Sequence, residues 1–539
     1  MLICKKYFWM NYRILIFLSL LLLMSCARRG RPEGGPKDFD KPIMVKADPA
    51  FESLHFDSDE IKIYFDEFIK LQDVNTQLII SPPLKNVPVI TPLGTPSKRI
   101  TIKLADTLQE NTTYTFNFGQ SVVDNTERNV LENFKYIFST GDYIDSLQVK
   151  GTIKDAFQLE MNDRPSLLLY RVDEMFKDSI IFNEKPMYVG SLIDSVNWEI
   201  TNIKSGKYLL IALNDVSKNY KYNPREDQIA YVSKYIQVPS DTLYNLSLFK
   251  EILEFDVPTK PVEVSKGHIM FGYQGDGRDF EVKAMSDTSS TYKSISIFDK
   301  DSDTLHYWFK NYEKDSLIFS LSNTVVFDTA RVVLRSEEID SLSLSSLTRG
   351  TLELRDTFKI KSNVPIYSID TSKISFLNKD SLKVNYQHVL SKHRNIITFN
   401  FEKEYQNKYD ILMLPGAVSD FFGIINDSLK IRFNTKKPTD YTSIYLNLQN
   451  IRTYPIIIEL IDSRGNVRAK TYATSEKEHQ FINLPASKYM VRIIYDTNKN
   501  GKWDTGNFLR RQQPEIVYYF SSIINAKANW QVEETFRME

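Results

Sequence analysis

The sequence predicts an all-β chain of tandem β-sandwich modules in an extended multi-domain arrangement. Apolar and polar residues alternate with a period of two, as in Ile61, Ile63 and Phe65, the pattern of strands with one buried face. The chain contains 30 Tyr and 33 Phe, and aromatic residues favour pleated, half-buried strands. Segments of the first half also recur in the second half. Because 539 residues are too many for one hydrophobic core, we expect several domains.

The charge balance excludes one broad class of function. Lys and Arg together number 68, and Asp and Glu together also number 68. A general polyanion binder would show a basic excess or stripe. We therefore expect no nucleic-acid partner.

The first 25 residues have the features of a lipoprotein signal peptide. Lys5, Lys6 and Arg13 precede an apolar run at 14–24, which as a helix is about half as long as a membrane span. The run ends in Leu-Met-Ser-Cys26, which resembles a lipobox, so Cys26 is the predicted lipidation site. The alternative is an ordinary secretory signal with an incidental cysteine. Translation starts at either Met1 or Met10.

Residues 26–41 are rich in Gly, Pro and charge, and they predict a flexible tether. The only cysteines are Cys4 and Cys26, so the mature chain would have no thiol for a disulfide or a zinc cluster. Attachment through two or three acyl chains on Cys26 would hold a soluble body at the outer membrane.

Internal similarity divides the body into repeated modules. Gly206–Asp215 aligns without gaps on Ser487–Asp496, an offset of 281. More loosely, Tyr114–Asp124 resembles Tyr409–Asp420. We therefore expect two copies of a two-module unit around a middle β segment, with modules at 42–141, 142–257, 258–350, 351–437 and 438–539.

Several of these modules resemble known families. Asp48-Pro49, Ile61–Glu67, Asn111–Phe116 and Phe138–Gly141 occur in the order found in the bacterial Ig-like domain of S-layer and envelope proteins, the SbsA type. Module 351–437 is a degenerate Ig-like copy by its similarity to the first module. Modules 142–257 and 438–539 look like transthyretin-like or carboxypeptidase-regulatory-like sandwiches.

The whole chain resembles Bacteroidota lipoproteins that carry Pro-x-Gly-Gly-Pro-Lys-Asp after the lipid cysteine, here Pro32–Asp38, a group with no assigned activity. In such lipoproteins, acidic residues just after the cysteine usually accompany export to the cell surface. Here Arg28, Arg29 and Arg31 are basic. The resemblance therefore favours the periplasmic face over surface exposure.

The segment 496–504 is a candidate calcium loop. Asp496, Asn498, Asn500 and Asp504 place oxygens at loop positions 1, 3, 5 and 9, and the carbonyl of Lys502 is available at position 7. The loop departs from an EF-hand because its position 12 lacks the bidentate Glu. The alternative is a hairpin loop held by bonds from Asn and Asp side chains to the backbone. Ca²⁺ is the only cofactor that the sequence suggests.

Asp followed by Ser or Thr and an apolar residue recurs along the chain and resembles the acceptor motif for O-glycosylation in Bacteroidota. The same composition also forms Asx and Ser/Thr turns that precede strands, and both interpretations can hold. The predicted acceptors are Thr107, Ser146, Ser179, Ser195, Thr242, Thr304, Ser316, Thr329, Ser341, Ser381 and Ser428.

Common catalytic motifs are absent from the sequence: it has no Gly-x-Ser-x-Gly, no His-Glu-x-x-His and no P-loop. We therefore expect a non-enzymatic scaffold of the cell envelope that holds a protein partner. The narrower alternative is an accessory subunit of an outer-membrane assembly or export machine. A carbohydrate-binding lipoprotein is a third, and it predicts that Trp503, Phe508 and Trp530 form an exposed flat platform.

Overall fold

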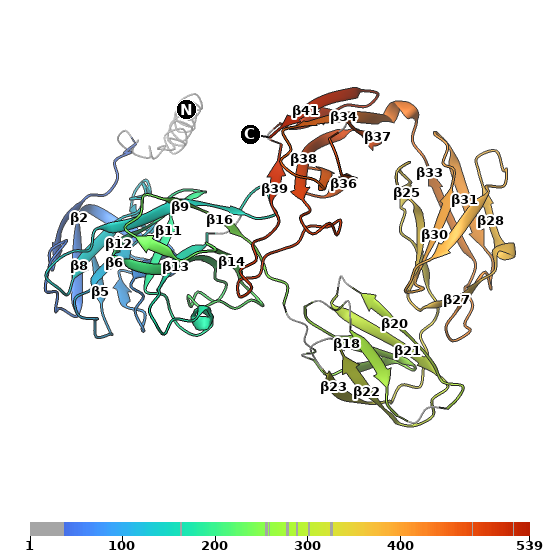
Figure 1. The fold of residues 1–539 in the computed structure, drawn as a ribbon, viewed down its shortest axis with the longest axis horizontal. Coiled ribbons are helices and arrows are strands. Elements are labelled where there is room, and N and C mark those ends of the chain that lie inside the picture. Colours follow the sequence, from blue (N-terminus) through green and yellow to red (C-terminus); the bar gives the residue numbers. More distant parts are fainter. Residues whose placement is uncertain are drawn as a thin grey trace, which may run out of the picture. The chain divides into compact units, whose positions relative to one another are not determined.

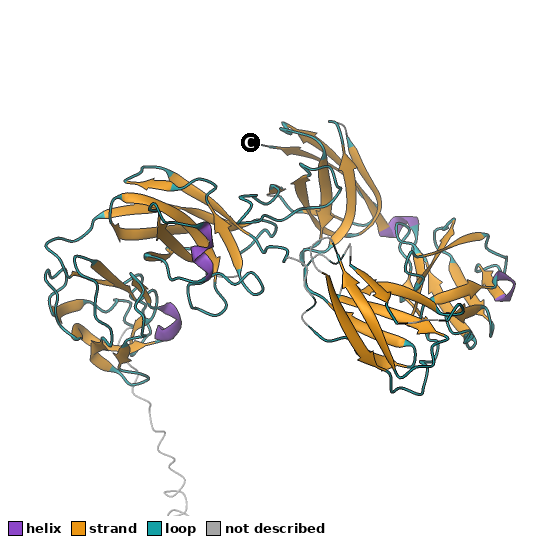
Figure 2. Cartoon of the chain, turned by 60° about the horizontal axis from the view of Figure 1, so that its bottom comes forward, coloured by secondary structure: helices purple, strands orange, loops and turns teal. Residues whose placement is uncertain are grey.

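The computed structural model describes residues 37–538 except 162–163, 254–256, 258, 276, 278–279, 287–288, 300–301, 324–326, 477 and 521. Strands dominate (Figures 1 and 2), which confirms the predicted all-β fold class. The described helical elements are short: α2 (Val74–Gln77), η1 (Asp178–Phe182), η2 (Thr371–Lys373) and η3 (Pro438–Asp440). None of them has the length and apolar character that crossing a membrane requires. The signal peptide and Cys26 lie outside the described residues.

The first compact unit comprises Met1–Ile80 and Leu84–Ile144. Its sheets run β1-β2-β5-β4, with β7 beside β2, and β3-β6-β8. Both sheets bury side chains in one core, and Ile61, Ile100, Phe116 and Phe138 are each fully buried there. The strands are β1 (Met44–Asp48), β2 (Glu60–Leu71), β3 (Ile79–Ser81), β4 (Val89–Thr91), β5 (Ser97–Lys103), β6 (Thr113–Asn117), β7 (Val122–Asp124) and β8 (Lys135–Ser139).

The second compact unit comprises Ser81–Pro83 and Asp145–Glu539. Its first sandwich has the strand order β14-β13-β10-β11-β12-β9-β16, with β15 beside β13. The strands are β9 (Leu147–Asp155), β10 (Ser166–Arg171), β11 (Tyr188–Leu192), β12 (Asn197–Ile203), β13 (Gly206–Asn214), β14 (Gln228–Tyr231), β15 (Ile236–Val238) and β16 (Leu243–Leu248).

The C-terminal sandwich of this unit has the sheets β36-β35-β38-β39, with β40 beside β38, and β37-β34-β41. The strands are β34 (Tyr441–Gln449), β35 (Ile456–Ile461), β36 (Val467–Ala473), β37 (His479–Pro485), β38 (Ser487–Tyr495), β39 (Val517–Tyr519), β40 (Ile524–Ala526) and β41 (Gln531–Arg537).

These two sandwiches are copies of each other, as the repeat predicted. Each strand from β9 to β16 has a counterpart from β34 to β41 in the same order, and the last strand of each copy pairs in parallel with the first. Strand β38 begins and ends 281 residues after β13. A tyrosine hydroxyl near the start of each of these strands donates to a carbonyl four residues earlier, Tyr208 to Lys204 and Tyr489 to Pro485.

Between the two copies lie two further groups of sheets. The middle group contains β17 (Val262–Ser265), β18 (His268–Gly272), β19 (Glu281–Ala284), β20 (Lys293–Asp299), β21 (Thr304–Lys310), β22 (Ser316–Ser322) and β23 (Phe327–Val333). The next contains β24 (Leu344–Ser346), β25 (Gly350–Thr351), β26 (Phe358–Ser362), β27 (Ile366–Ile369), β28 (Ile374–Leu377), β29 (Tyr386–Leu390), β30 (Ile396–Phe401), β31 (Lys408–Met413), β32 (Val418–Asp420) and β33 (Leu429–Asn434). Strand β24 precedes residue 350 but pairs with β26, so the later module takes in residues before the expected boundary.

The Ig-like module and the module around β31 share hydrogen bonds at a constant offset of 295. The Tyr114 hydroxyl accepts from the backbone N of Gln109 at 2.9 Å, and the Tyr409 hydroxyl accepts from that of Glu404 at 3.0 Å.

The threonine that closes each of these modules repeats a second pair of bonds. Thr140 Oγ1 donates to the Gln109 carbonyl, and Thr435 Oγ1 donates to the Glu404 carbonyl. Each hydroxyl also accepts from a backbone N, that of Thr112 or of Asn407. These shared bonds confirm the looser internal repeat, because they fix the same strand ends in both modules.

Candidate functional site

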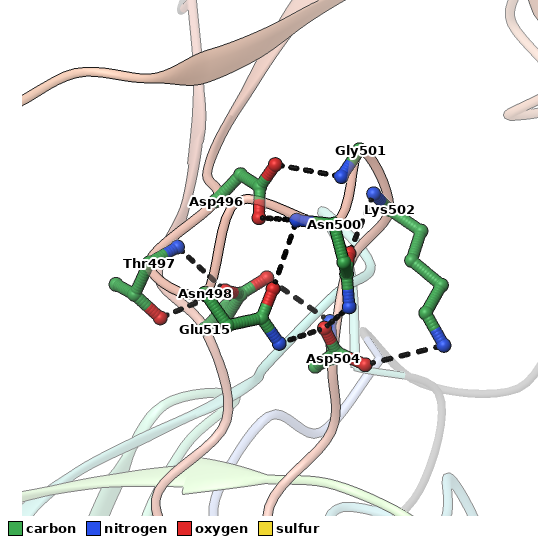
Figure 3. Close-up of polar contacts among 8 residues, drawn as sticks. All are labelled: Asp496, Thr497, Asn498, Asn500, Gly501, Lys502, Asp504 and Glu515. Carbon is green, nitrogen blue, oxygen red and sulfur yellow. Dashed lines mark hydrogen bonds and ion pairs between the residues drawn. The ribbon is translucent and has the colours of Figure 1, made fainter.

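The predicted calcium loop connects β38 to β39, and its four side chains converge (Figure 3). Asp496 is 1% exposed, and its carboxylate accepts from the backbone N of Asn500 at 3.0 Å and of Gly501 at 2.7 Å. The side-chain amides of Asn498 and Asn500 donate to Asp504 Oδ2. Gly501 has a φ of 77°, which a residue with a side chain adopts only with strain. The loop is thus closed by its own hydrogen bonds.

Glu515 also belongs to this site, although no sequence pattern predicts it. Its side chain is 7% exposed. Glu515 Oε1 accepts from Thr497 N at 2.7 Å and Thr497 Oγ1 at 2.8 Å, and Oε2 accepts from Asp504 N at 3.1 Å (Figure 3). Glu515 therefore holds both ends of the loop. Glu515 stands just before β39, 11 residues beyond Asp504, and no known motif has an acidic residue at that spacing.

The first copy of the sandwich has a corresponding pair of carboxylates, one buried (Asp227) and one half-buried (Asp215). Asp227 is fully buried and accepts from Val216 N at 2.9 Å and Asn223 N at 2.8 Å. These donors stand 281 residues before Thr497 and Asp504, which bond to Glu515. Asp215 likewise accepts from Tyr220 N at 2.5 Å, which corresponds to Gly501. Since both copies use the carboxylates in the same way, organising the loop backbone is their shared role.

The carboxyl groups of the two loops lie in different environments. Burial is the largest influence on Asp215 and raises the pKa of its carboxyl group. Burial acts in the same direction on Asp504, but the amides of Asn498 and Asn500 and the ammonium of Lys502 outweigh it and lower the pKa of Asp504. Lys502 Nζ lies 3.5 Å from Asp504 Oδ1. The pKa of Asp215 in the first loop and that of Asp504 in the second therefore shift in opposite directions.

Within the described part of the chain, no group of three or more His, Cys, Asp or Glu side chains is arranged to hold a metal ion. Asn498, Asn500 and the carbonyl of Lys502 also offer oxygens to a cation, so calcium binding stays a prediction. The hydrogen bonds seen in the loop are those of the alternative interpretation, a hairpin held by Asn and Asp side chains.

The segment 505–513, which follows this loop, packs against the first copy of the sandwich. Phe508 is fully buried, with its ring edge-on to Tyr231 at 5.2 Å between centroids. Arg511 Nε donates to Asp178 Oδ2 at 3.0 Å, and its guanidinium lies over the rings of Tyr231 and Tyr235. We call residues 505–513 the docking segment. It holds together two modules that are more than 200 residues apart in the sequence.

The aromatic platform expected of a carbohydrate binder is not formed. Phe508 is buried in the docking segment contact. Trp503 packs on Phe157 at 4.7 Å between centroids and donates its Nε1 hydrogen to the Glu515 carbonyl. Only Trp530 is largely exposed, at 52%. The three rings therefore do not form one surface, and the carbohydrate-binding alternative loses the platform that it predicts.

The middle module contains a histidine pair that sequence spacing does not predict, because its members stand 38 residues apart. His268 Nε2 lies 2.9 Å from His306 Nδ1, and the His268 ring stacks on Trp308 at 3.6 Å. His268 is 5% exposed, and its Nδ1 atom is 3.8 Å from Asp340 Oδ2, too far for a hydrogen bond. Burial, and then His306, lower the pKa of His268 to about 4.

This pair predicts acid sensitivity. The neutral form of His268 is favoured in the folded protein, whereas the unfolded chain binds a proton near pH 6.5. Its contribution to stability is therefore complete above pH 6.5 and is lost as the pH falls toward 4. We expect the urea midpoint of the middle module to fall across that window, and to fall less in His268→Gln. Equal pH profiles for the two proteins would contradict the assignment.

The predicted glycosylation acceptors are mostly accessible. Nine of the eleven side chains are exposed, and the other two, Thr304 and Ser316, are half-buried at the starts of β21 and β22. Thr304 Oγ1 donates to the Ser302 carbonyl, and Ser316 Oγ accepts from Arg331. Exposure is necessary for modification and is also typical of turns, so glycosylation stays a prediction.

Comparison with known proteins identifies one domain. Residues 38–140 match the family model of the bacterial Ig-like domain, Big_5, which confirms the Ig-like domain predicted at the start of the body. A search of curated proteins gives no match.

Among solved structures, the S-layer protein SbsC is 13% identical with a TM-score of 0.14, over 85% of this chain and 66% of that one. The major pilin subunit BcpA of Bacillus cereus is 9% identical with a TM-score of 0.14, over 72% and 99%. The Escherichia coli adhesin FdeC is 8% identical with a TM-score of 0.16, over 55% and 98%. The chain spans less than two thirds of the SbsC structure, and likenesses this distant carry no information on function.

Proposed function

We propose that the protein is a lipid-anchored, non-enzymatic scaffold of the cell envelope, held at the periplasmic face of the outer membrane through Cys26. The observation that carries the proposal is the hydrogen bonding of four carboxylates, three of them buried and one, Asp215, half-buried. Asp496 and Glu515, like Asp215 and Asp227 in the first copy, accept hydrogen bonds from the protein's own backbone. Carboxylates that accept hydrogen bonds from the backbone are suited to holding loops in place rather than to acid–base chemistry.

The docking segment supports the same proposal. It joins the two copies of the sandwich through a buried ring and a two-bond contact between Arg511 and Asp178. A scaffold benefits from modules that keep fixed positions, because a partner can then contact more than one of them at once. The Ig-like domain at 38–140 is a fold that carries many functions, so the domain alone does not decide the role.

Membrane fractionation tests the anchoring. The tagged wild type should sediment with the outer membrane, and Cys26→Ser should appear in the soluble periplasmic fraction. The matched control is Cys4→Ser, which changes the other cysteine of the chain and should leave the location unchanged. If Cys26→Ser remained in the membrane fraction, lipid anchoring at this residue would be wrong.

Calcium binding at 496–504 is a separate proposal that would stiffen the same loop. We expect the C-terminal module to melt at a higher temperature in calcium than in a chelator, because a ligand that binds only the folded state at 100 times its Kd stabilises by about 2.7 kcal/mol. Asp504→Asn removes the charge at the loop tip and should abolish the calcium-dependent difference. Magnesium serves as the control ion, since its smaller octahedral shell suits this spacing less well. Identical melting in calcium and in chelator would show that the proposed calcium binding at 496–504 is wrong.

A further inference from the structure

The outer face of the first sheet in the N-terminal unit carries several exposed apolar side chains. Core residues Ile61, Ile63 and Phe65 of β2 point inward, so their neighbours point outward. The outward side chains include Ile43 and Val45, each 64% exposed, Val89 at 60% and Phe68 at 55%. We call this surface the outer face of the β1-β2-β5-β4 sheet.

Basic residues surround these apolar groups. Strand register places Lys46 beside Tyr64, and Tyr64 beside Arg99, on the outer face. Lys46 Nζ lies 4.8 Å from the centre of the Tyr64 ring, and Lys98 Nζ lies 5.5 Å from that of Phe68. Lys62 and Lys103 also belong to the basic set, and both lie near the carboxylate of Glu60.

The balance of charge on this face is positive. The strands contribute six basic side chains outward, Lys46, Lys62, Lys70, Lys98, Arg99 and Lys103, against the three acids Asp48, Glu60 and Asp66. A surface that combines exposed aliphatic and aromatic groups with lysine and arginine is typical of proteins that lie at a membrane interface. Each basic residue near an anionic bilayer adds attraction that salt weakens.

The position of this face in the chain points to its partner. Ile43 lies only 17 positions after Cys26, and a fully extended chain of that length spans at most about 60 Å. Strand β1 is the first strand described after the predicted lipid anchor. A tethered face is thereby kept at a high effective concentration near the bilayer.

We propose that the outer face of the β1-β2-β5-β4 sheet lies against the anionic phospholipid surface of the membrane to which the chain is anchored. The proposal rests on the proposed lipid anchoring for its geometry. Apolar side chains would enter the headgroup region, while the lysines and arginine would contact phosphate groups. The first module would then be oriented on the membrane as well as tethered to it.

Vesicle binding of the unlipidated chain from Ala27 onward tests the face independently of the lipid. We expect co-sedimentation with vesicles of equal parts phosphatidylglycerol and phosphatidylcholine, weakened by salt and absent with phosphatidylcholine alone. The triple variant Lys46→Glu, Lys98→Glu and Arg99→Glu should bind roughly a hundredfold more weakly, since each basic residue contributes about fivefold. All three side chains are exposed, so folding is expected to be preserved.

The matched control reverses two lysines and one arginine on exposed strand positions of the later Ig-like copy, Lys408→Glu, Lys430→Glu and Arg432→Glu. It should bind like the wild type. Equal losses in both triple variants would reduce the effect to net charge and overturn the proposal, as would failure of the wild type to bind. Self-association that only the first variant abolishes would assign the face to a second copy instead. Failed anchoring would show in the Cys26→Ser fractionation and leave this result intact.

Discussion

Phe508→Ala is expected to separate the C-terminal sandwich from the first copy while leaving both folded. Phe508 is fully buried against Tyr231, but it is not part of the core of the C-terminal module. Loss of a buried phenylalanine costs about 3–5 kcal/mol. Most of this cost would weaken the contact between the docking segment and the first copy of the sandwich. Calorimetry should show two separate transitions where the wild type shows coupled melting.

Leu509→Ala is the matched control, because this neighbouring side chain is 57% exposed. It should melt like the wild type. Hydrogen exchange should also quicken across 505–513 in Phe508→Ala and stay slow in Leu509→Ala. If both variants behaved alike, the packing of the docking segment would not hold the modules together.

Glu515→Ala is expected to destabilise the C-terminal module by about 2 kcal/mol, because the backbone donors of Thr497 and Asp504 lose the buried carboxylate that accepts from them. Glu515→Gln should cost less, since it keeps one oxygen that can accept from Thr497. Asp227→Ala should have a similar effect in the first copy, where Val216 and Asn223 lose their acceptor. Urea unfolding of each variant measures the loss.

The control for this series is Glu533→Ala, an exposed glutamate on β41 that should be nearly neutral. Wild-type stability in Glu515→Ala, combined with loss of a calcium response, would contradict the structural role and assign the carboxylate to ion binding.

Local patterns explain what could be predicted from the sequence. Alternation of apolar residues along β2 and β5 depends only on neighbouring positions, so it predicts strands before any tertiary contact is known. Repeats are equally readable, because Gly206–Asp215 and Ser487–Asp496 keep their order without gaps. The strands β13 and β38 have the bounds that this alignment implies.

Contacts between distant residues explain what was missed. Glu515 is 11 residues beyond Asp504 and belongs to no recognisable spacing, yet it accepts from both ends of the loop. Arg511 and Asp178 are 333 residues apart. Strand β24 is only three residues long and lacks an alternating pattern, so its pairing with β26 is decided by tertiary packing.

Purification of the tagged, lipidated protein from gently solubilised membranes, with mass spectrometry of the bound proteins, tests the scaffold function most directly. We predict a stoichiometric envelope protein that is retained by the wild type and reduced in Cys26→Ser, which would not reach the membrane. Such a partner would also show whether the scaffold belongs to an assembly or export machine. A wild-type protein that is recovered alone, under conditions that preserve known membrane complexes, would contradict a scaffold role.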